Sequence, residues 1–370
     1  MKTSVCHITS VHSWNDIRIF QKECKSLVDK GFDVHLICQM EKDVTIEGVQ
    51  IHGVRKPSSR IDRIFKLSKD CYQRAVEINS QLYHIHDPEL LPIALKLKKL
   101  GKLVIYDAHE NTPASIIDKE WIPFQFVRNF VSKVFEKYEL NVSKQLDAVI
   151  SVAEPLLERY IQNEKVLIRN LPILDNFKGE ELSPEMQKAE KGAVYAGGLT
   201  SARNIKEMID AVGKSYQIKV LHLFGEWESK DYMTICKRSK GWSKVCYWGF
   251  KDSKQVYTFL KEKGLIGLIL FDKDIKNHKI ALPNKAFEYM AAGLPILMSD
   301  IAYWKENFHS VAKFTDPSDS EKISKSIDDM ISDQKQLSER VEKGLREVNM
   351  LNWQKESQVL IDLYRRLINT

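Results

Sequence analysis

Short runs rich in β-branched residues alternate with segments of helical periodicity along nearly the whole chain. This alternation is typical of α/β proteins, in which crossover helices join parallel strands. In the first half, the predicted strands are residues 5–9, 33–38, 82–86, 102–108, 147–152 and 166–170. In the second half, they are residues 193–198, 219–225, 245–250, 266–271, 295–299 and 311–316. The sequence therefore predicts parallel sheets covered by helices.

A polar stretch at residues 173–192 interrupts this alternation, and we interpret it as a linker. A chain of 370 residues exceeds the size at which one hydrophobic core usually keeps growing. We therefore expect Rossmann-like domains over residues 1–172 and 190–350, followed by an amphipathic helix over residues 351–370. Ligands of open parallel sheets bind beyond the carboxyl ends of the strands, so a cleft between the two domains is expected to hold the substrates.

Charge and cysteine spacing restrict the partners and the location of the protein. The formal net charge of +6 permits an anionic partner without requiring one. Nucleic acid is not expected, because the sequence has no zinc-finger spacing, Walker loop or basic tail. The six cysteines are scattered without a CxxC pair, which favours reduced thiols. With no signal-peptide pattern and no apolar run of about 18 residues, we expect a cytoplasmic protein.

The segment LPNKAFEYMAAGLPIL, residues 282–297, predicts a helix followed by a buried strand. Pro283 and Asn284 are favoured at helix starts, and an Asn side chain can cap free N–H groups there. A helix start also suits a phosphate. Glu288 lies one turn further, where it can accept hydrogen bonds from sugar hydroxyls attached to that phosphate. The alternative is that Glu288 only complements the helix dipole, and the residues themselves support both interpretations equally.

The PNKAFEYMAAGLPIL segment closely resembles the nucleotide-binding segment of retaining GT-B glycosyltransferases of family 4, of the kind that build bacterial polysaccharides. Four more segments resemble that family in order and spacing: residues 10–37, with an Asp-x-Arg-Ile loop, and residues 83–110, 194–212 and 351–367. The resemblance implies a GT-B fold, with two Rossmann-like domains facing a central cleft and a C-terminal helix crossing back. It also implies a glycosyltransferase that uses a UDP- or GDP-sugar donor and a glycan or lipid-linked acceptor in surface polysaccharide synthesis.

The same resemblance implies the donor-binding residues of the C-terminal domain. Glu288 matches the second glutamate of the EX7E motif, which binds the donor ribose. Arg203 takes the position of the usual lysine and is expected to contact the pyrophosphate. Gly198 replaces the usual arginine after Gly197, and Lys285 is expected to compensate for that loss, the alternative being a solvated lysine. The first EX7E glutamate is replaced by Ile280, so its role toward the donor sugar is not carried over.

Further positions at strand ends complete the expected substrate-binding set. By resemblance, Gly225 and Phe250 belong to the pocket for the nucleotide base. The neighbouring Trp248 belongs either to that pocket or to the core. Phe271 to Asp274, FDKD, superficially offers the DxD metal motif of another glycosyltransferase fold. We interpret these four residues as a solvated loop, and we predict neither a required metal nor a cofactor.

In the N-terminal domain, His109 follows the predicted strand 102–108 at its carboxyl end. The matching histidine of the family lies near the donor sugar and supports transfer through a hydrogen bond. The alternative is a structural histidine, and Asp107 either shares the functional role or only holds the loop. Asp16 and Arg18, in the first loop, are expected either to bind acceptor or donor phosphate or to pair with each other.

Residues 121–140, WIPFQFVRNFVSKVFEKYEL, combine aromatic and basic residues in a helical pattern. Such a helix can lie on an anionic membrane surface, which would make the protein peripheral to the inner face of the membrane. The alternative is a helix that packs on the core of the N-terminal domain. Two other functions stay open from the sequence: a nucleotide-sugar 2-epimerase of the same fold, and a non-catalytic GT-B partner subunit.

Overall fold

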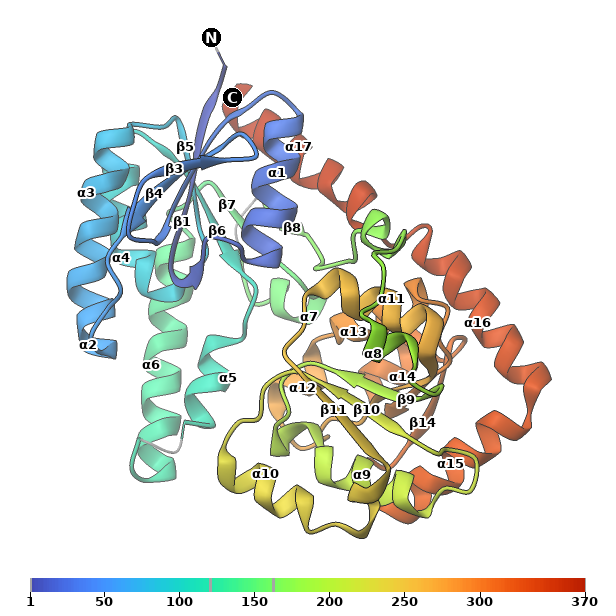
Figure 1. Ribbon diagram of the computed structural model, residues 1–370. Helices are drawn as coiled ribbons and strands as arrows, with labels where there is room; N and C mark the ends of the chain where they lie inside the picture. Colours follow the sequence, from blue (N-terminus) through green and yellow to red (C-terminus); the bar gives the residue numbers. More distant parts are fainter. Residues whose placement is uncertain (1, 120–121, 162–163, 370) are drawn as a thin grey trace. The chain divides into compact units, whose positions relative to one another are not determined.

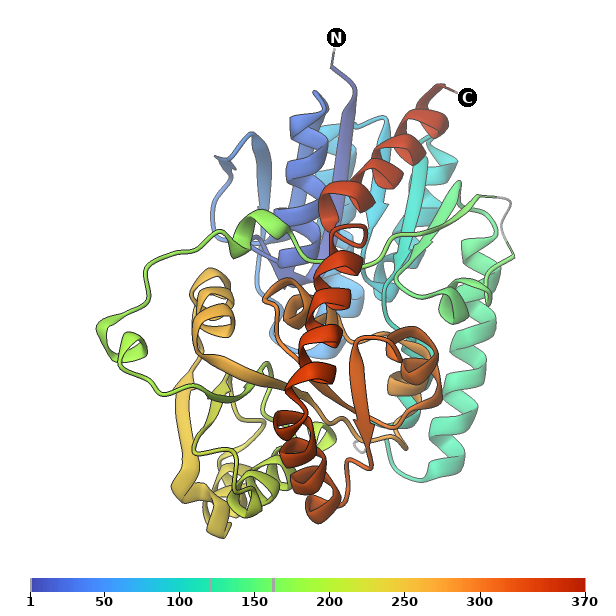
Figure 2. The ribbon, with the colours of Figure 1, turned by 90° about the vertical axis from the view of Figure 1, so that its right-hand side faces the viewer.

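The computed structural model describes residues 2–119, 122–161 and 164–369, which fold into two compact units (Figures 1 and 2). Unit 1 comprises Met1–Asn170 and Lys355–Thr370, and unit 2 comprises Leu171–Gln354. Each unit contains one sheet and one hydrophobic core. All six cysteines are free thiols, as the sequence predicts. Among the described helices, none has the length and apolar character needed to span a membrane.

Unit 1 is built on a mixed eight-stranded sheet in the order β3-β4-β2-β1-β5-β6-β7-β8. Its strands are β1 (Ser4–Ser13), β2 (Asp33–Gln39), β3 (Val44–Ile46), β4 (Val49–Val54), β5 (Leu82–Ile85), β6 (Leu103–Ala108), β7 (Ala148–Ser151) and β8 (Lys165–Leu167). Among the strands of the described residues, β3 and β4 alone pair antiparallel, and this hairpin is absent from the sequence-based prediction. Its two-residue turn has positive φ at Glu47 and Gly48 (48° and 82°), which is the backbone of a type I′ turn.

The helices of unit 1 cover both faces of this sheet. They are η1 (a π-helix, Ile17–Cys24), α1 (Lys25–Asp29), α2 (Arg60–Asp62), η2 (Arg63–Leu67), α3 (Ser68–Ile78), η3 (Pro88–Leu90), α4 (Leu91–Lys99), α5 (Thr112–Ile117), α6 (Gln125–Ser143), α7 (Glu154–Leu157) and, from Lys355 onward, α17 (Trp353–Asn369). Figure 1 shows α1 and α17 on one face, and α3 and α4 on the other. The helix predicted for residues 121–140 corresponds to α6, although residues 120–121 lie outside the described part of the chain.

Unit 2 is built on a fully parallel six-stranded sheet in the order β11-β10-β9-β12-β13-β14. Its strands are β9 (Gly192–Ala196), β10 (Leu221–Phe224), β11 (Val245–Gly249), β12 (Gly264–Ile269), β13 (Ile296–Ser299) and β14 (Ala312–Thr315). All six were predicted, with shifted ends. The strand order reverses between β9 and β12, and ligands of doubly wound sheets bind beyond the strand ends at such a point.

The helices of unit 2 connect these strands. They are η4 (Leu174–Phe177), α8 (Pro184–Gln187), η5 (Ser201–Arg203), α9 (Ile205–Lys214), α10 (Lys230–Lys237), η6 (Lys240–Lys244), α11 (Ser253–Lys263), α12 (Lys276–Ile280), α13 (Asn284–Ala291), α14 (Ala302–Phe308), α15 (Ser320–Ser332) and α16 (Gln334–Val348).

The polar stretch at residues 173–192 is part of unit 2, so its interpretation as a linker is wrong. Phe177, Leu182 and Met186 are buried in the core of that unit. The ring of Phe177 also stacks on Tyr257 of α11, with 4.2 Å between the ring centroids. Three well-spaced apolar side chains therefore fix a segment whose average composition is polar.

Candidate functional site

The loops beyond β9 and β10 approach each other so closely that they require glycine. Gly197 and Gly225 both have positive φ, at 150° and 126°. A Cβ atom on Gly225 would lie 2.0 Å from the carbonyl oxygen of Gly197. A Cβ atom on Gly197 would lie 2.5 Å from Nζ of Lys285. The backbone at Gly197 therefore leaves room for the amine of Lys285 at the point where the strand order reverses.

Arg203 and Lys285 converge on the same tyrosine, Tyr195 of β9. Nη1 of Arg203 donates a hydrogen bond to Tyr195 Oη at 2.9 Å, and its guanidinium lies over the Phe271 ring, 4.9 Å from the centroid. Nζ of Lys285 lies 5.7 Å from the centroid of the Tyr195 ring. Tyr195 Oη in turn donates to the carbonyl oxygen of Gly198 at 3.2 Å. The structure thus brings both predicted phosphate contacts together with the predicted glycine turn.

Neither of these two cations forms an ion pair with a carboxylate among the described residues. Burial lowers the pKa of Lys285; the nearby Glu288 opposes this shift, and Arg203 adds to it. Two half-buried positive charges close to each other repel. An anion bound between them would relieve that repulsion.

The start of α13 differs from the sequence-based prediction in one respect. The residue that precedes the helix is Pro283, and no side chain caps the first turn. Asn284 is the first residue of the helix and its side chain is exposed, so the prediction that it caps the helix is wrong. Because no side chain caps the first turn, N–H groups at the helix start remain available to a ligand.

Glu288 is half-buried in the second turn of α13, away from the exposed surface. Tyr257 Oη donates a hydrogen bond to its Oε1 atom at 3.2 Å. Burial, and then the Glu288 carboxylate, raise the pKa of Tyr257, so the phenol stays protonated and remains a donor. A carboxylate fixed in this way is oriented before any ligand binds.

The two aromatic residues proposed for a base pocket differ in their surroundings. Trp248 of β11 packs on Phe224 and Phe259, and its Nε1 donates to His222 Nδ1 at 3.1 Å, which supports its alternative place in the core. Phe250, just after β11, is 77% exposed. Gly225 is joined to the end of β11, because its N–H donates to the carbonyl oxygen of Gly249 at 2.9 Å.

The FDKD loop lies next to the loop that carries Arg203. The N–H of Asp272 donates to the carbonyl oxygen of Ala202 at 2.9 Å. The carboxylate of Asp272 accepts the N–H of Asp274 at 2.8 Å, and the Asp274 side chain is 87% exposed. Asp272 to Asp274 thus form a partly solvated turn, but Phe271 is buried in the core of unit 2, which corrects the interpretation of all four residues as a solvated loop. Ile280, which replaces the first EX7E glutamate, is the last residue of α12.

In unit 1, Arg18 forms a buried bidentate pair with Asp107 near the end of β6. The Nε–Oδ2 and Nη2–Oδ1 distances are 2.8 and 2.9 Å, and Nη1 donates to the carbonyl oxygen of Ile168 at 3.2 Å. Burial opposes ionisation of Asp107, but Arg18, His109 and His86 together outweigh it and hold the pKa of that carboxyl well below its usual range. The Arg18 side chain is therefore engaged inside unit 1, which corrects its prediction as a phosphate ligand or as a side-chain partner of Asp16.

Asp16 acts on the backbone instead, at the start of η1. Its Oδ1 accepts the N–H groups of Arg18 and Ile19, and its Oδ2 lies 3.0 Å from Nδ1 of His12. Burial opposes ionisation of Asp16, but the His12 hydrogen bond and these N–H donors lower its pKa to about 2. Asp16 thus stays ionised at neutral pH.

His109 lies directly beyond β6, beside Asp107. Its Nδ1 is 3.2 Å from the carbonyl oxygen of Asp107 and 3.5 Å from the Oδ2 atom of the same residue. Burial disfavours the charged imidazole, but Asp107 outweighs burial and raises the pKa of His109. The ring also meets that of His12 edge-on, at 5.7 Å between centroids. His109 and Asp16 are thus joined through His12 at the carboxyl ends of β1 and β6.

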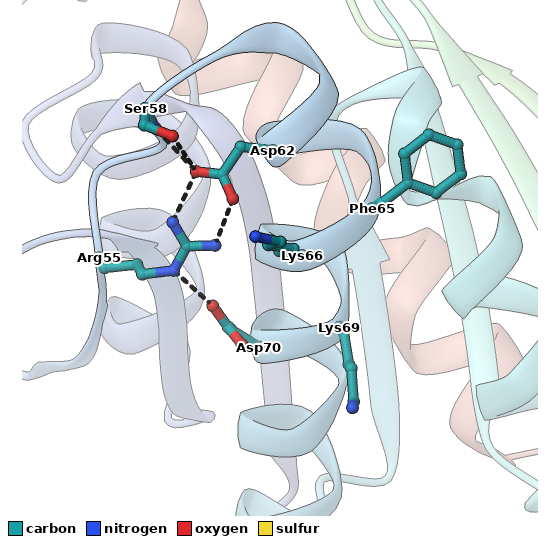
Figure 3. Close-up of a pocket in the computed structure, with 7 residues that line it drawn as sticks. All are labelled: Arg55, Ser58, Asp62, Phe65, Lys66, Lys69 and Asp70. Atoms are coloured by element: carbon teal, nitrogen blue, oxygen red, sulfur yellow. Dashed lines mark hydrogen bonds and ion pairs between the residues drawn. The ribbon is translucent and has the colours of Figure 1, made fainter.

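Figure 3 shows an open pocket of unit 1 that contains no predicted site residue. Arg55 forms a bidentate pair with Asp62, with Nη1–Oδ2 and Nη2–Oδ1 distances of 2.7 and 2.8 Å. Its Nε donates to Asp70 at 3.0 Å, and Ser58 donates to Asp62 through both its N–H and its hydroxyl. These groups satisfy one another, and Lys66 and Lys69 also line the pocket.

Several residues that shape the two sites were not predicted. Tyr195, Tyr257, Phe271 and His12 hold Arg203, Glu288 and His109 in place. The position of Tyr195 in the β-strand before Gly197 was the available signal, since it precedes the first glycine of the turn by two residues. The other contacts join elements that are far apart in the sequence.

Two doubly wound sheets in one chain, the first mixed and the second fully parallel, with a cation-lined glycine turn at the switch point of the second, define the GT-B class. The chain belongs to the glycosyltransferases, with a family 4-like GT-B fold: residues 18–168 match Glycosyltransferase Family 4, and residues 180–347 match Glycosyl transferases group 1. No curated protein sequence matches the chain significantly.

Solved structures share the fold over nearly the full chain. Sucrose-phosphate synthase from Thermosynechococcus elongatus has a TM-score of 0.78 at 14% identity, with 100% of both chains covered. A glycosyltransferase from Rickettsia africae has a TM-score of 0.74 at 15% identity, with 99% of both chains covered. Anabaena HepE in complex with UDP-glucose has a TM-score of 0.73 at 12% identity, covering 98% of this chain and 99% of the other.

Proposed function

We propose that this glycosyltransferase moves a sugar from a UDP- or GDP-linked donor to a glycan or lipid-linked acceptor in surface polysaccharide synthesis. We assign the donor to unit 2 and the acceptor to unit 1. The observation that carries the proposal is the convergence of Arg203 and Lys285 on Tyr195, without a carboxylate partner among the described residues. Two cations beside a helix start are suited to a diphosphate.

The proposed chemistry is stabilisation of the leaving group. Negative charge develops on the diphosphate as the glycosidic bond breaks, and fixed cations such as Arg203 and Lys285 lower the free energy of that state. The backbone at the start of α13, near Asn284, adds partial positive charge. Under this proposal no metal is required at the diphosphate. His109, whose pKa Asp107 raises, donates a hydrogen bond, and we propose retention of the anomeric configuration.

Replacing Glu288 with Gln tests the donor half of this proposal. We expect the dissociation constant for the nucleoside diphosphate to rise about 10- to 100-fold, because a charge-assisted hydrogen bond is worth about 1.5–3 kcal/mol. Titration calorimetry with UDP and GDP measures this change, and thermal unfolding measures stability. Unchanged binding in a folded E288Q variant would contradict the assignment.

A matched control separates ligand binding from a simple helix-dipole effect. Glu207 lies in the first turn of α9, where a carboxylate stabilises the helix by a few tenths of a kcal/mol. We expect Glu207→Gln to lower stability slightly and to leave nucleotide binding unchanged. If E288Q behaves like E207Q, Glu288 only complements the dipole of α13.

The alternative functions predict different products. A 2-epimerase would convert the sugar of the donor without an acceptor, and a non-catalytic subunit would release no nucleotide. We expect a panel of nucleotide-sugars to include one that raises the melting temperature, since a ligand specific to the folded state stabilises it. Release of UDP or GDP from that donor should then require the acceptor. Epimerised donor, or no release with any acceptor, would overturn the proposal.

We also propose that α6 contacts the membrane at its inner face. Phe124, Phe126 and Phe130 are 67%, 72% and 67% exposed, and the first two rings stack on each other at 5.6 Å. An exposed aromatic group on a helix that also carries Lys133 and Lys137 suits the interface of an anionic bilayer. A core-packing α6 would bury these rings.

Replacing all three phenylalanines with Ser should reduce binding to vesicles that contain anionic phospholipid at least tenfold, because each ring would no longer enter the interface. Co-sedimentation measures the bound fraction, and neutral vesicles should bind more weakly than anionic ones. Tyr216 of unit 2 is 76% exposed, so Tyr216→Ser serves as the control and should leave binding unchanged. Equal binding by the triple variant and the wild type would rule out this contact.

A further inference from the structure

Three buried histidines and a buried glutamate meet inside unit 1. His7 of β1 is paired in register with His84 of β5, and His86 directly follows β5, two residues after His84. Glu23 reaches these histidines from η1. His7, Glu23 and His84 are fully buried, and His86 is 1% exposed. Neither the proposed donor site nor the proposed acceptor site uses this cluster.

The spacing of the four side chains is that of ligands around a shared ion. Oε2 of Glu23 lies 3.7 Å from His7 Nδ1, 3.8 Å from His84 Nδ1 and 3.8 Å from His86 Nε2. The His7 Nδ1–His86 Nε2 distance is 2.9 Å, and all four atoms lie within 4.8 Å of one another. Ligands about 2.0–2.2 Å from a tetrahedral ion lie roughly 3.3 Å apart. Most of these separations are too long for hydrogen bonds.

Glu23 has no hydrogen-bond partner for either carboxylate oxygen among the described residues. Oε1 forms an ion pair with Nε of Arg18 at 3.2 Å, but the same guanidinium makes its bidentate contact with Asp107. A fully buried carboxylate without hydrogen bonds is costly. The Oε2 atom points at three imidazole nitrogens, so a cation among them would compensate its charge.

The outer nitrogens of two histidines are held as metal ligands usually are. Nδ1 of His86 lies 3.1 Å from Asp107 Oδ2, and Nε2 of His7 lies 3.1 Å from the hydroxyl of Tyr364 in α17. Such second contacts fix the tautomer and the ring orientation of metal-binding histidines. His84 Nδ1 lies 2.8 Å from the same hydroxyl, and it would exchange that hydrogen bond for the ion.

We propose that His7, His84, His86 and Glu23 bind one divalent transition-metal ion of the zinc class. Imidazole and carboxylate ligands suit zinc, and four protein ligands without an open position are typical of a structural site. The ion would tie β1, β5 and η1 together behind the Arg18–Asp107 pair that adjoins His109. This site departs from the sequence-based expectation of a metal-free protein, and it is independent of the proposed donor binding.

The metal content of the wild-type protein tests the site directly. Protein without a histidine tag, expressed in medium containing zinc and dialysed against a weak chelator, should contain about one equivalent of zinc by mass spectrometry. Protein expressed with Co²⁺ instead should show the strong visible absorption of tetrahedral cobalt. Less than a tenth of an equivalent of either metal would overturn the proposal and show that Glu23 keeps a proton instead.

Variants then locate the bound ion. Glu23→Gln preserves shape and removes the charged ligand, so we expect at least a tenfold loss of bound zinc and of the cobalt spectrum. His222→Gln removes a buried histidine of unit 2 and should keep the full equivalent. Full zinc content in E23Q, or loss of zinc in H222Q alone, would place the ion elsewhere and overturn the assignment. If E23Q does not fold, the cobalt spectrum of the wild-type protein decides between tetrahedral histidine-rich ligation and no site.

Discussion

Replacing Arg203 with Met is expected to lower kcat by about 10²- to 10³-fold with little change in stability. The guanidinium is fixed between the Tyr195 hydroxyl and the Phe271 ring, so it is oriented before the leaving group develops its charge. Removing one such fixed group typically costs two to three orders of magnitude in kcat. The Met side chain keeps apolar contact with Phe271. Steady-state kinetics with the donor identified by thermal screening measures kcat and KM separately.

The charge of Arg203 can be separated from its shape. Arg203→Lys should retain much of the activity, since it keeps a cation near the diphosphate. Combining R203M with Lys285→Met should reduce kcat by less than the product of the two single effects, because both cations act on one charge. Lys206, on the next turn, already pairs with Asp210, and Lys206→Met should leave kcat within about twofold. An R203M enzyme with wild-type kcat would refute the proposed role.

The central strands of both sheets could be predicted because they are buried on both faces. Such strands form continuous apolar runs, and the buried strands β9, β10 and β13 each match a predicted run. The hairpin of β3 and β4 was missed because β3 has only three residues, which are half-exposed or exposed. The stretch at residues 173–192 was misinterpreted because three buried side chains, spaced among many polar ones, are enough to fix a segment on a core.

The candidate sites were predictable where one segment of chain holds the relevant residues. Gly197, Gly198 and Arg203 share one loop, and Lys285 and Glu288 share one helix. The partners of these residues depend on which distant segments become neighbours. Arg18 shows the difference most clearly, because its partner Asp107 is 89 positions away in the sequence. Local sequence patterns predicted a phosphate or Asp16 as the partner of Arg18. The real partner, Asp107, is reached only because the folded chain brings β6 close to η1.

Replacing Arg18 with Met is expected to lower the free energy of unfolding of unit 1 by about 3–5 kcal/mol, because the variant leaves Asp107 buried without its cation. Arg18 is 6% exposed and Asp107 is 1% exposed, so water cannot take the place of the lost partner. For a unit of this size the melting temperature should fall by roughly 10 °C. Scanning calorimetry, which can resolve two units that unfold separately, measures the effect.

Arg55 provides a control of the same geometry in solvent. Its bidentate pair with Asp62 has distances close to those of the buried pair, but its side chain is 43% exposed (Figure 3). In Arg55→Met, Asp62 keeps both hydrogen bonds from Ser58 and gains water, so the loss of stability should be much smaller than in R18M. The double variant Arg18→Met, Asp107→Leu should recover part of the stability, since no buried charge is left unpaired. Equal destabilisation by R18M and R55M would show that burial does not set the strength of these pairs.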